Sequence, residues 1–420
     1  DEAHELTDRV TSVATGELTP GPLGVTVRRT ARLVGPELTQ RLEAAVATFA
    51  SAIHDAQPGR IDHIDDELAT YLTALRDAAG AARSAIDPAP KDPAAAAARS
   101  ESIAALTEVA DTAARVLDSF APPIAERTDV VWLDHEEQRG SGAVNPVLRV
   151  APLSVAALLA ERVFGASTAV LTSATLTLGG SFDAMAEAWG LARGPDWRGL
   201  DVGSPFDHAK SGILYVAGHL PPPGRDGAGS AEQLDEIAGL IEAAGGRTLG
   251  LFSSMRAARA AAEAMRQRLD TPVLCQGEDS TAALIERFAA DPQTSLFGTL
   301  SLWQGVDVPG PSLSLVIIDR IPFPRPDDPL LTARQRAVAA RGGNGFMAVA
   351  ASHAALLLAQ GAGRLLRRTD DRGVVAVLDS RMATARYGGY LRASLPPFWT
   401  TTDPTLVRDA LRRLSAPGPG

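Results

Sequence analysis

From residue 204 onward, short apolar runs alternate with amphipathic stretches, and this alternation constrains the fold more than any other feature of the sequence. The apolar runs, among them ILYVA, TLGLFSS, LSLVIID and GVVAVLD, have the length and composition of buried strands. Helical periodicity follows these runs at residues 231–244, 256–269, 280–290 and 346–359. Because strands that alternate with helices form parallel sheets covered on both faces, we predict a doubly wound α/β domain over residues 204–414.

Residues 5–126 have a different pattern, in which apolar side chains recur every three or four positions. One such run comprises Leu38, Leu42, Val46, Phe49 and Ile53. Because Pro and Gly fall between the runs, we expect a bundle of separate helices that pack their own apolar stripes. Further along, TDVVWLDHEEQ and AVNPVLRVAP are typical of short strands, and TAVLTSAT is typical of a buried strand.

Composition limits the classes of protein to which the chain can belong. Its 420 residues exceed the usual size of one domain, so we expect two or three. The net charge of -10 excludes a generally basic surface, although a locally basic channel remains compatible with nucleic acid. The single cysteine, Cys275, excludes a disulfide framework and favours a reducing, cytoplasmic setting. No run of about 18 apolar residues occurs, so we expect no membrane span.

The first four residues, Asp1-Glu2-Ala3-His4, spell a metal-and-water motif of nucleotide hydrolases. In that motif the first carboxylate holds Mg²⁺ and the second handles the attacking water. An acidic pair can equally begin a helix. The phosphate-binding loop GxxxxGK[ST] is absent, because neither Lys91 nor Lys210 lies in such a sequence. If the motif is functional, we therefore expect this chain to be the C-terminal portion of a longer protein and to hydrolyse no ATP alone.

Two further stretches carry polar residues where parallel strands are predicted to end. Ser173-Ala174-Thr175 closes the predicted strand TAVLTSAT, at the edge of a sheet where ligands bind. In SLWQGVDVPG, Gly305 permits close backbone approach and Asp307 offers a carboxylate. Each stretch by itself is also compatible with an ordinary turn.

The stretch QGAGRLLRR places four polar or small residues in a register that we interpret as helical: Gln360, Gly363, Arg364 and Arg367. Residues three apart share a helix face, so we expect the two guanidinium groups to project together. Paired guanidinium groups suit a triphosphate, whose developing charge they neutralise. Surface arginines near the end of a helix are the alternative.

The order of these motifs, DEAH, SAT, LFSS, GVD and QxxGRxxR, resembles the second half of the motif series of superfamily 2 helicases. The chain most closely resembles the DinG branch of the XPD-like DNA helicases, over residues 127–400 and the opening DEAH. LTSATLTLGGSFD, SLWQGVDVPG, DRIPFPRPDDP and LAQGAGRLLRRTDDRGVVAVLDSR carry the resemblance.

The resemblance implies two RecA-like motor domains with a helical arch inserted in the first. Residues 1–4 would then be the DEAH end of the first motor domain, 5–126 the all-helical arch, and 127–203 the remainder of that motor domain. Residues 204–414 would form the second motor domain, and 415–420 a disordered tail. ATP and Mg²⁺ are the implied cofactors. Any [4Fe–4S] cluster would lie upstream, with no ligand from this chain.

The family also implies roles for individual residues. Asp1 and Glu2 would bind Mg²⁺ and act in hydrolysis, and Arg364 and Arg367 would act with them. Gly305, Asp307, Gln360 and Gly363 would complete the ATP site. His4, Ser173 and Thr175 would couple hydrolysis to DNA movement, and Ser253 and Ser254 would lie near the DNA backbone. His135 and Glu136 resemble a metal pair, but no third ligand is evident.

The resemblance implies a monomeric, cytoplasmic and nucleoid-associated helicase of DNA repair or replication that moves 5′ to 3′ on single strands. Two other hypotheses remain open. One is a nucleic-acid-binding or regulatory fragment without catalysis, which the absent lysine loop favours. The other is an RNA helicase of the DEAH class, which the DEAH motif alone would permit.

Overall fold

The largest element of the computed structural model, which describes residues 1–86, 93–137, 144–191, 197–224, 229–299, 302 and 313–416, is a seven-stranded sheet. Its strand order is β11-β5-β10-β9-β6-β8-β7, and the paired strands all run parallel. The strands are β5 (Gly212–Val216), β6 (Thr248–Phe252), β7 (Val273–Cys275), β8 (Ser295–Thr299), β9 (Leu315–Ile318), β10 (Gly373–Val377) and β11 (Trp399–Thr401). The structure confirms the predicted parallel α/β sheet.

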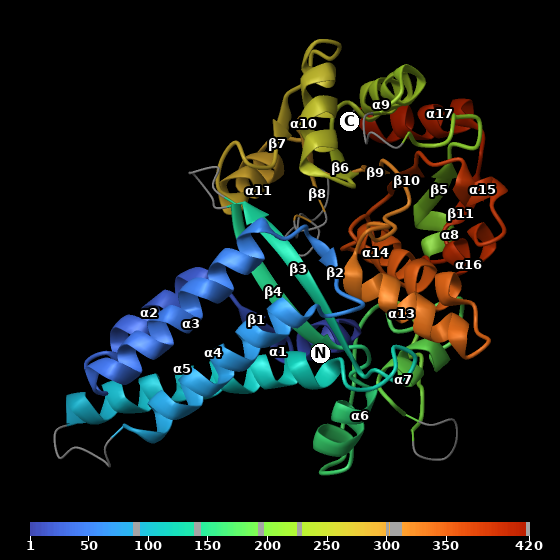
Figure 1. Ribbon diagram of the computed structural model, residues 1–420. Coiled ribbons are helices and arrows are strands. Elements are labelled where there is room, and N and C mark those ends of the chain that lie inside the picture. The colour runs from blue at the N-terminus through green and yellow to red at the C-terminus, as the bar shows by residue number, and fades with distance from the viewer. Residues whose placement is uncertain are drawn as a thin grey trace.

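Helices cover both faces of this sheet, as a doubly wound fold requires (Figure 1). One face packs on α9 (Ala231–Ala244), α10 (Met255–Arg266) and α17 (Pro404–Ser415). The other packs on α11 (Thr281–Ala290), α14 (Ser352–Ala362) and α16 (Gly388–Ala393). In β9, Leu315 and Ile317 enter the first core while Val316 and Ile318 enter the second. Burial on both faces explains why the strand sequences are continuously apolar rather than alternating.

Local signals set the ends of several helices. At the start of α9 the Ser230 hydroxyl accepts a hydrogen bond from the Gln233 backbone N–H (3.2 Å). At its end Gly245 adopts a left-handed conformation with φ 64°. Ser254 and Ser280 cap α10 and α11 in the same way as Ser230 caps α9. Ser at the start of a helix and Gly at its end are residue types that favour these boundaries.

Between Pro20 and Ser119 the chain forms the predicted helices, which extend away from the seven-stranded sheet as an elongated bundle (Figure 1). They are α2 (Pro20–Thr30), α3 (Pro36–Asp55), α4 (Asp66–Ser84) and α5 (Pro93–Ser119), preceded by η1 (Ala3–Glu5) and α1 (Leu6–Val13). Leu42, Phe49, Leu72 and Leu106 are completely or almost completely buried in their common core. None of the described helices combines the length and apolarity needed to cross a membrane.

A second, antiparallel sheet departs from the prediction. Its strands are β1 (Gly16–Leu18), β2 (Gly59–Arg60), β3 (Asp129–Glu137) and β4 (Val144–Pro152), in the order β1-β4-β3-β2. The region expected to be all-helical therefore supplies two short strands. Residues 129–152, expected with the first motor domain, share a sheet and an apolar core with the helical bundle instead. The reason is pairing over long range: Leu18 lies opposite Leu148, and both are buried against the helices.

The prediction of a buried strand at residues 168–175 is wrong. This segment is assigned to no strand, residues 174–175 form a turn, and Val170 is 83% exposed. A strand needs a backbone partner along its whole length. Here one backbone hydrogen bond, from Ala3 N–H to Thr172 O (2.9 Å), joins the segment to the start of the chain. The neighbouring helices are α6 (Ala156–Leu159), the π-helix η2 (Ala160–Phe164) and α7 (Asp183–Ala188).

Of the remaining described helices, the first directly precedes β5 and the others lie between strands of the large sheet. They are α8 (His208–Ser211), α13 (Pro329–Ala340), the π-helix η4 (Phe346–Ala351) and α15 (Arg381–Thr384). α17 runs to Ser415, whose hydroxyl donates to Ala243 O (3.2 Å), so the first residue of the predicted disordered tail is helical. Residues 417–420 of that tail lie outside the described part.

Candidate functional site

The first residues of the chain lie against residues 172–175, although more than 160 residues separate them in sequence. His4 Nδ1 is 2.6 Å from Ser173 Oγ. The Thr172 hydroxyl donates to Asp1 Oδ1 (3.1 Å). Thus the DEAH and SAT motifs, which the sequence singled out separately, form one cluster.

Ser173 is the hub of this cluster. Its hydroxyl donates to Glu2 Oε2 (3.3 Å), lies 3.4 Å from Thr175 Oγ1, and accepts from the Thr175 backbone N–H (3.2 Å). His4 Nδ1 also lies 3.2 Å from Glu2 Oε2. The His4 side chain is only 6% exposed whereas that of Glu2 is 59% exposed. The arrangement therefore links a solvent-facing carboxylate to the buried His4 and the partly buried Ser173 and Thr175.

The backbone of Glu2 is strained. Its φ of 52° and ψ of 41° place it in the left-handed region, which costs a residue with a side chain about 1–2 kcal/mol. Such conformations persist where the surroundings impose them, and they gather at functional sites. Asp1 Oδ1 accepts from the Glu2 backbone N–H (2.9 Å), and this bond fixes the position of the Asp1 carboxylate relative to the Glu2 backbone.

The donor set around Asp1 fits a magnesium ion. A carboxylate flanked by hydroxyls supplies the hard oxygen ligands that Mg²⁺ takes, usually one or two carboxylates completed by water and phosphate. No group of three or more His, Cys, Asp or Glu side chains in the described part of the chain is placed to hold a metal by itself. A magnesium ion here would depend on oxygens of a bound phosphate.

Arg364 and Arg367 do not share a helix face, contrary to the prediction. α14 ends at Ala362, and Gly363 is its C-terminal cap, so both arginines lie in the following turn. The reason is Asp371, whose Oδ2 accepts the backbone N–H groups of Arg367 and Arg368 at 2.8 Å each. Pinning these donors stabilises a turn instead of another helical repeat.

The two arginines still differ from their neighbour Arg368. Arg364 and Arg367 are partly buried, whereas the Arg368 side chain is 63% exposed and pairs with Asp370. Gln360, in the last turn of α14, is also partly buried. Leu365 and Leu366, between the arginines, enter the same apolar core as Ala3 of the DEAH motif. The turn and the DEAH segment therefore belong to one side of the large sheet.

Gly305 and Asp307 lie outside the described residues, so their predicted contribution to the site remains a prediction. His135 and Glu136 lie on β3, and the Glu136 carboxylate is bound by Arg149. Cys275 is buried in β7, and burial raises the pKa of its thiol. A buried thiol with a raised pKa is poorly reactive, so we interpret Cys275 as an ordinary strand residue.

Ser253 and Ser254 follow β6 at the carboxyl edge of the large sheet. Ser253 donates to Asp319 twice, from its backbone N–H to Oδ1 (3.0 Å) and from its hydroxyl to Oδ2 (3.1 Å). Ser254 caps α10 by accepting from Ala257 N–H (3.1 Å). Ser253 is thus held by a carboxylate at the end of the adjacent strand β9, and Ser254 by the first turn of α10.

Asp319 was not singled out from sequence, yet it is one of the most buried charges, 3% exposed. Burial raises its pKa to about 6, against the lowering effect of Arg320, whose Nε donates to Oδ2 (3.2 Å), and of the Ser253 hydroxyl. Asp379, completely buried at the end of β10, accepts from Ile321 N–H (3.0 Å). A single signal could have found both: an Asp directly after an apolar strand, in LSLVIID and GVVAVLD.

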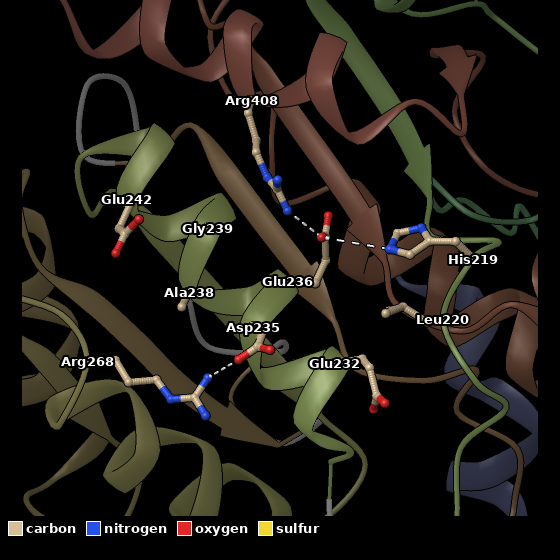
Figure 2. Close-up of a pocket in the computed structure, with 10 residues that line it drawn as sticks. All are labelled: His219, Leu220, Glu232, Asp235, Glu236, Ala238, Gly239, Glu242, Arg268 and Arg408. Atoms are coloured by element: carbon tan, nitrogen blue, oxygen red, sulfur yellow. Dashed lines mark hydrogen bonds and ion pairs between the residues drawn. The ribbon is translucent and has the colours of Figure 1, made fainter.

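A polar hollow of about 670 Å³ lies elsewhere, between α9 and α17 (Figure 2). At its floor the Glu236 carboxylate accepts from Arg408 Nη2 (2.5 Å) and from the Tyr215 hydroxyl (2.8 Å), and burial together with this bond raises the pKa of Tyr215. At the rim Arg268 binds Asp235 (2.7 Å). The buried Glu236 carboxylate is already paired with Arg408. We therefore interpret this hollow as a structural contact that holds α17 on α9.

Known proteins resemble the chain in sequence over nearly its whole length. Residues 237–398 match the family described as helicase C-terminal domain. The chain is 76% identical to the ATP-dependent helicase DinG of Mycobacterium tuberculosis strain H37Ra over 415 residues, 99% of the chain and 62% of that relative. To the ATP-dependent DNA helicase YoaA of Escherichia coli strain K12 it is 39% identical over 275 residues, 64% of the chain and 42% of that relative. The chain therefore spans less than two thirds of these curated relatives.

Solved structures resemble it in fold. The structure of S. tokodaii Xpd4 matches with a TM-score of 0.58 at 13% identity, over 96% of the chain and 74% of that structure. A structure described as XPD helicase matches with a TM-score of 0.54 at 16% identity, over 96% of the chain and 68% of that structure. At this identity the likeness concerns the fold alone, and it confirms the XPD-like architecture expected from the motif order.

Proposed function

The chain belongs to the DinG family of helicases, and from this premise we propose that it is part of an ATP-driven motor that moves on single-stranded DNA. Strand separation would follow from 5′ to 3′ movement, with little sequence preference because backbone contacts carry no sequence information. In this proposal the motor is a monomer in the cytoplasm, associated with the nucleoid, and acts in DNA repair or replication.

The observation that carries the proposal is the contact between the DEAH and SAT motifs. A motor must convert a change at its nucleotide into movement, and Ser173 touches both the exposed Glu2 and the buried His4. Asp1 would hold Mg²⁺, which neutralises phosphate charge, and Glu2 would orient and deprotonate the attacking water. Ser173, Thr175 and His4 would pass the change in charge onward.

The second part of the nucleotide site would come from the turn after α14. Arg364 and Arg367 would neutralise charge on the transferred phosphate, and Gln360, Gly363, Gly305 and Asp307 would complete the binding surface. The helical bundle together with the β3–β4 hairpin would form the arch, because they share one core. Any iron–sulfur cluster would be held by residues that this chain does not contain.

Glu2→Gln tests the proposal in a protein with the length of the curated relatives. The amide keeps the shape of the side chain but cannot take a proton, so we expect ATP to bind normally while DNA-stimulated hydrolysis falls about 10²- to 10⁴-fold. Phosphate release and nucleotide binding are measured on the same preparation. Near-normal turnover would remove Glu2 from the site.

The arginines offer a comparison with a built-in control. Arg364→Ala and Arg367→Ala should each reduce hydrolysis by about 10³-fold or more, as arginines that act on a transferred phosphate do. Arg368→Ala should have little effect, because this exposed side chain pairs with another surface group, Asp370. Equal behaviour of the three variants would contradict the assignment.

A nucleic-acid-binding fragment without catalysis is the second candidate. It is favoured by the sequence itself, in which neither lysine lies in a phosphate-binding loop. Residues 1–420 alone should accordingly release phosphate only at background, with or without single-stranded DNA. DNA-stimulated release from a preparation free of other ATPases would show that the phosphate site is misplaced.

A further inference from the structure

Three aromatic rings meet beside the carboxyl edge of the large sheet. Phe323 follows β9 by five residues, Phe346 begins η4, and Tyr387 precedes α16. Each pair of ring centroids is separated by 5.3 Å, with interplanar angles of 46°, 87° and 49°. The rings come from three separate stretches of chain, so folding alone brings them together.

These rings are not sealed inside the core. Phe346 is 39% exposed, and Phe323 and Tyr387 are only half-buried. Aromatic side chains carry a large apolar area, and leaving three of them accessible at one place forgoes burial that the fold could have used. We name Phe323, Phe346 and Tyr387 the aromatic platform.

A cation is fixed on the platform. The Arg381 guanidinium lies 5.7 Å from the centroid of Phe323, within the range of a cation–π contact. Asp379 orients it by accepting from Nε at Oδ1 (2.9 Å) and Oδ2 (3.3 Å) and from Nη2 at Oδ2 (2.7 Å). The same carboxylate accepts from Ile321 N–H (3.0 Å), two residues before the platform. One buried group therefore positions both the ring and the cation.

The platform adjoins the serines that follow β6. Ile321 and Arg320 connect it directly to Asp319, which binds Ser253. Beyond β9 and β10 the carboxyl edge thus presents π faces with a fixed guanidinium. The exposed Arg386 directly precedes Tyr387 in sequence, and the exposed Arg341 lies five residues before Phe346.

We propose that the aromatic platform, with Arg381, stacks the bases of single-stranded DNA at the carboxyl edge of the large sheet. This inference rests on the proposed function, since it gives the motor a place to grip unpaired bases. Every base has a π face, so stacking is tolerant of sequence, as a motor needs. A duplex hides these faces, so the platform selects single strands.

The test measures binding of the full 420-residue chain to two fluorescent oligonucleotides by anisotropy. One is a thymidine oligomer, and the other has the same backbone with abasic sites in place of the bases. In Phe346→Leu the side chain remains apolar but loses its π face. We expect binding of the thymidine oligomer to weaken about tenfold, in the range known for loss of one stacked base, and binding of the abasic oligomer to stay unchanged.

A control and a second variant complete the design. Trp399→Ala removes a ring of similar exposure, 47%, on the edge strand β11 and should leave both affinities unchanged. Phe346→Trp should restore tight binding of the thymidine oligomer, because the π face returns. Thermal unfolding of each variant shows whether its fold is retained.

The outcomes separate this inference from the proposed function. If the wild-type chain binds both oligomers while Phe346→Leu weakens neither, or weakens both equally, the platform is overturned and the DNA-binding motor stands. If the wild-type chain binds neither oligomer across a range of salt concentrations, DNA binding by this chain is overturned, and the platform with it.

Discussion

Replacing Asp319 with Asn tests how the carboxyl edge of the sheet is built. The Asp319 carboxyl is 3% exposed, and burial raises its pKa from an ordinary 3.8 to about 6. A group whose folded-state pKa is raised binds more protons in the folded than in the unfolded protein between these values. Ionised Asp319 therefore lowers the free energy of unfolding, and the protein gains stability as the pH falls through 6.

The size of the effect follows from the same values. A difference of about two pKa units corresponds to about 3 kcal/mol, most of it gained between pH 6 and pH 4. Asn cannot ionise, so the variant lacks this contribution. The difference in free energy of unfolding between wild type and Asp319→Asn should change by about 3 kcal/mol in favour of wild type as the pH falls from 7 to 4.

Urea unfolding of both proteins at constant ionic strength measures this difference, and effects of other carboxylates cancel in the subtraction. Arg320→Met is the control, because removal of the nearby guanidinium should raise the pKa of Asp319 further and move the window above pH 6. A difference that does not vary with pH would refute the reasoning, since Asp319 would then titrate as an exposed carboxyl does.

Three more predictions concern contacts between elements. Arg408→Met should lower the free energy of unfolding by about 3 kcal/mol, measured in urea, because it leaves the buried Glu236 carboxylate without its cation. The double variant Arg408→Met, Glu236→Gln should recover much of this loss. Gly179→Ala should lower the melting temperature, because φ is +60° and the added Cβ would lie 2.7 Å from the Tyr390 ring; unchanged melting would contradict this. Arg334→Ala removes bonds to Leu153 O and the Thr11 hydroxyl, so hydrogen exchange in α1 should accelerate while exchange in β9 stays slow.

Much of the large sheet was predictable because its signals are local. Strands β5, β6, β9 and β10 are short apolar runs that alternate with amphipathic stretches, and this pattern needs no knowledge of distant residues. Ser230 before α9 and Gly245 after it mark the ends of that helix in the same local way. The ordered motif series likewise identified the family, since each motif is a contiguous string of residues.

Such local patterns do not predict which strands pair when the strands are far apart in sequence. The β3–β4 hairpin could have joined either sheet, and its pairing with Gly16–Leu18 and Gly59–Arg60 is what places it on the helical bundle. The segment at 168–175 has the composition of a buried strand, but composition does not supply a hydrogen-bonding neighbour. Arg364 and Arg367 have helical spacing, but Asp371 captures the backbone donors that a longer helix would have used.

The same division holds for the candidate site. The sequence alone determined which candidate residues were available: those of the DEAH segment, those of the SAT segment and a pair of arginines. Their meeting around Ser173, the buried Asp319 and Asp379 behind the carboxyl edge, and the three rings of the aromatic platform came from tertiary folding. The physical reason is that hydrogen bonding, desolvation and stacking depend on separation in space, and residues far apart in sequence acquire that separation only when the sheet and its covering helices pack.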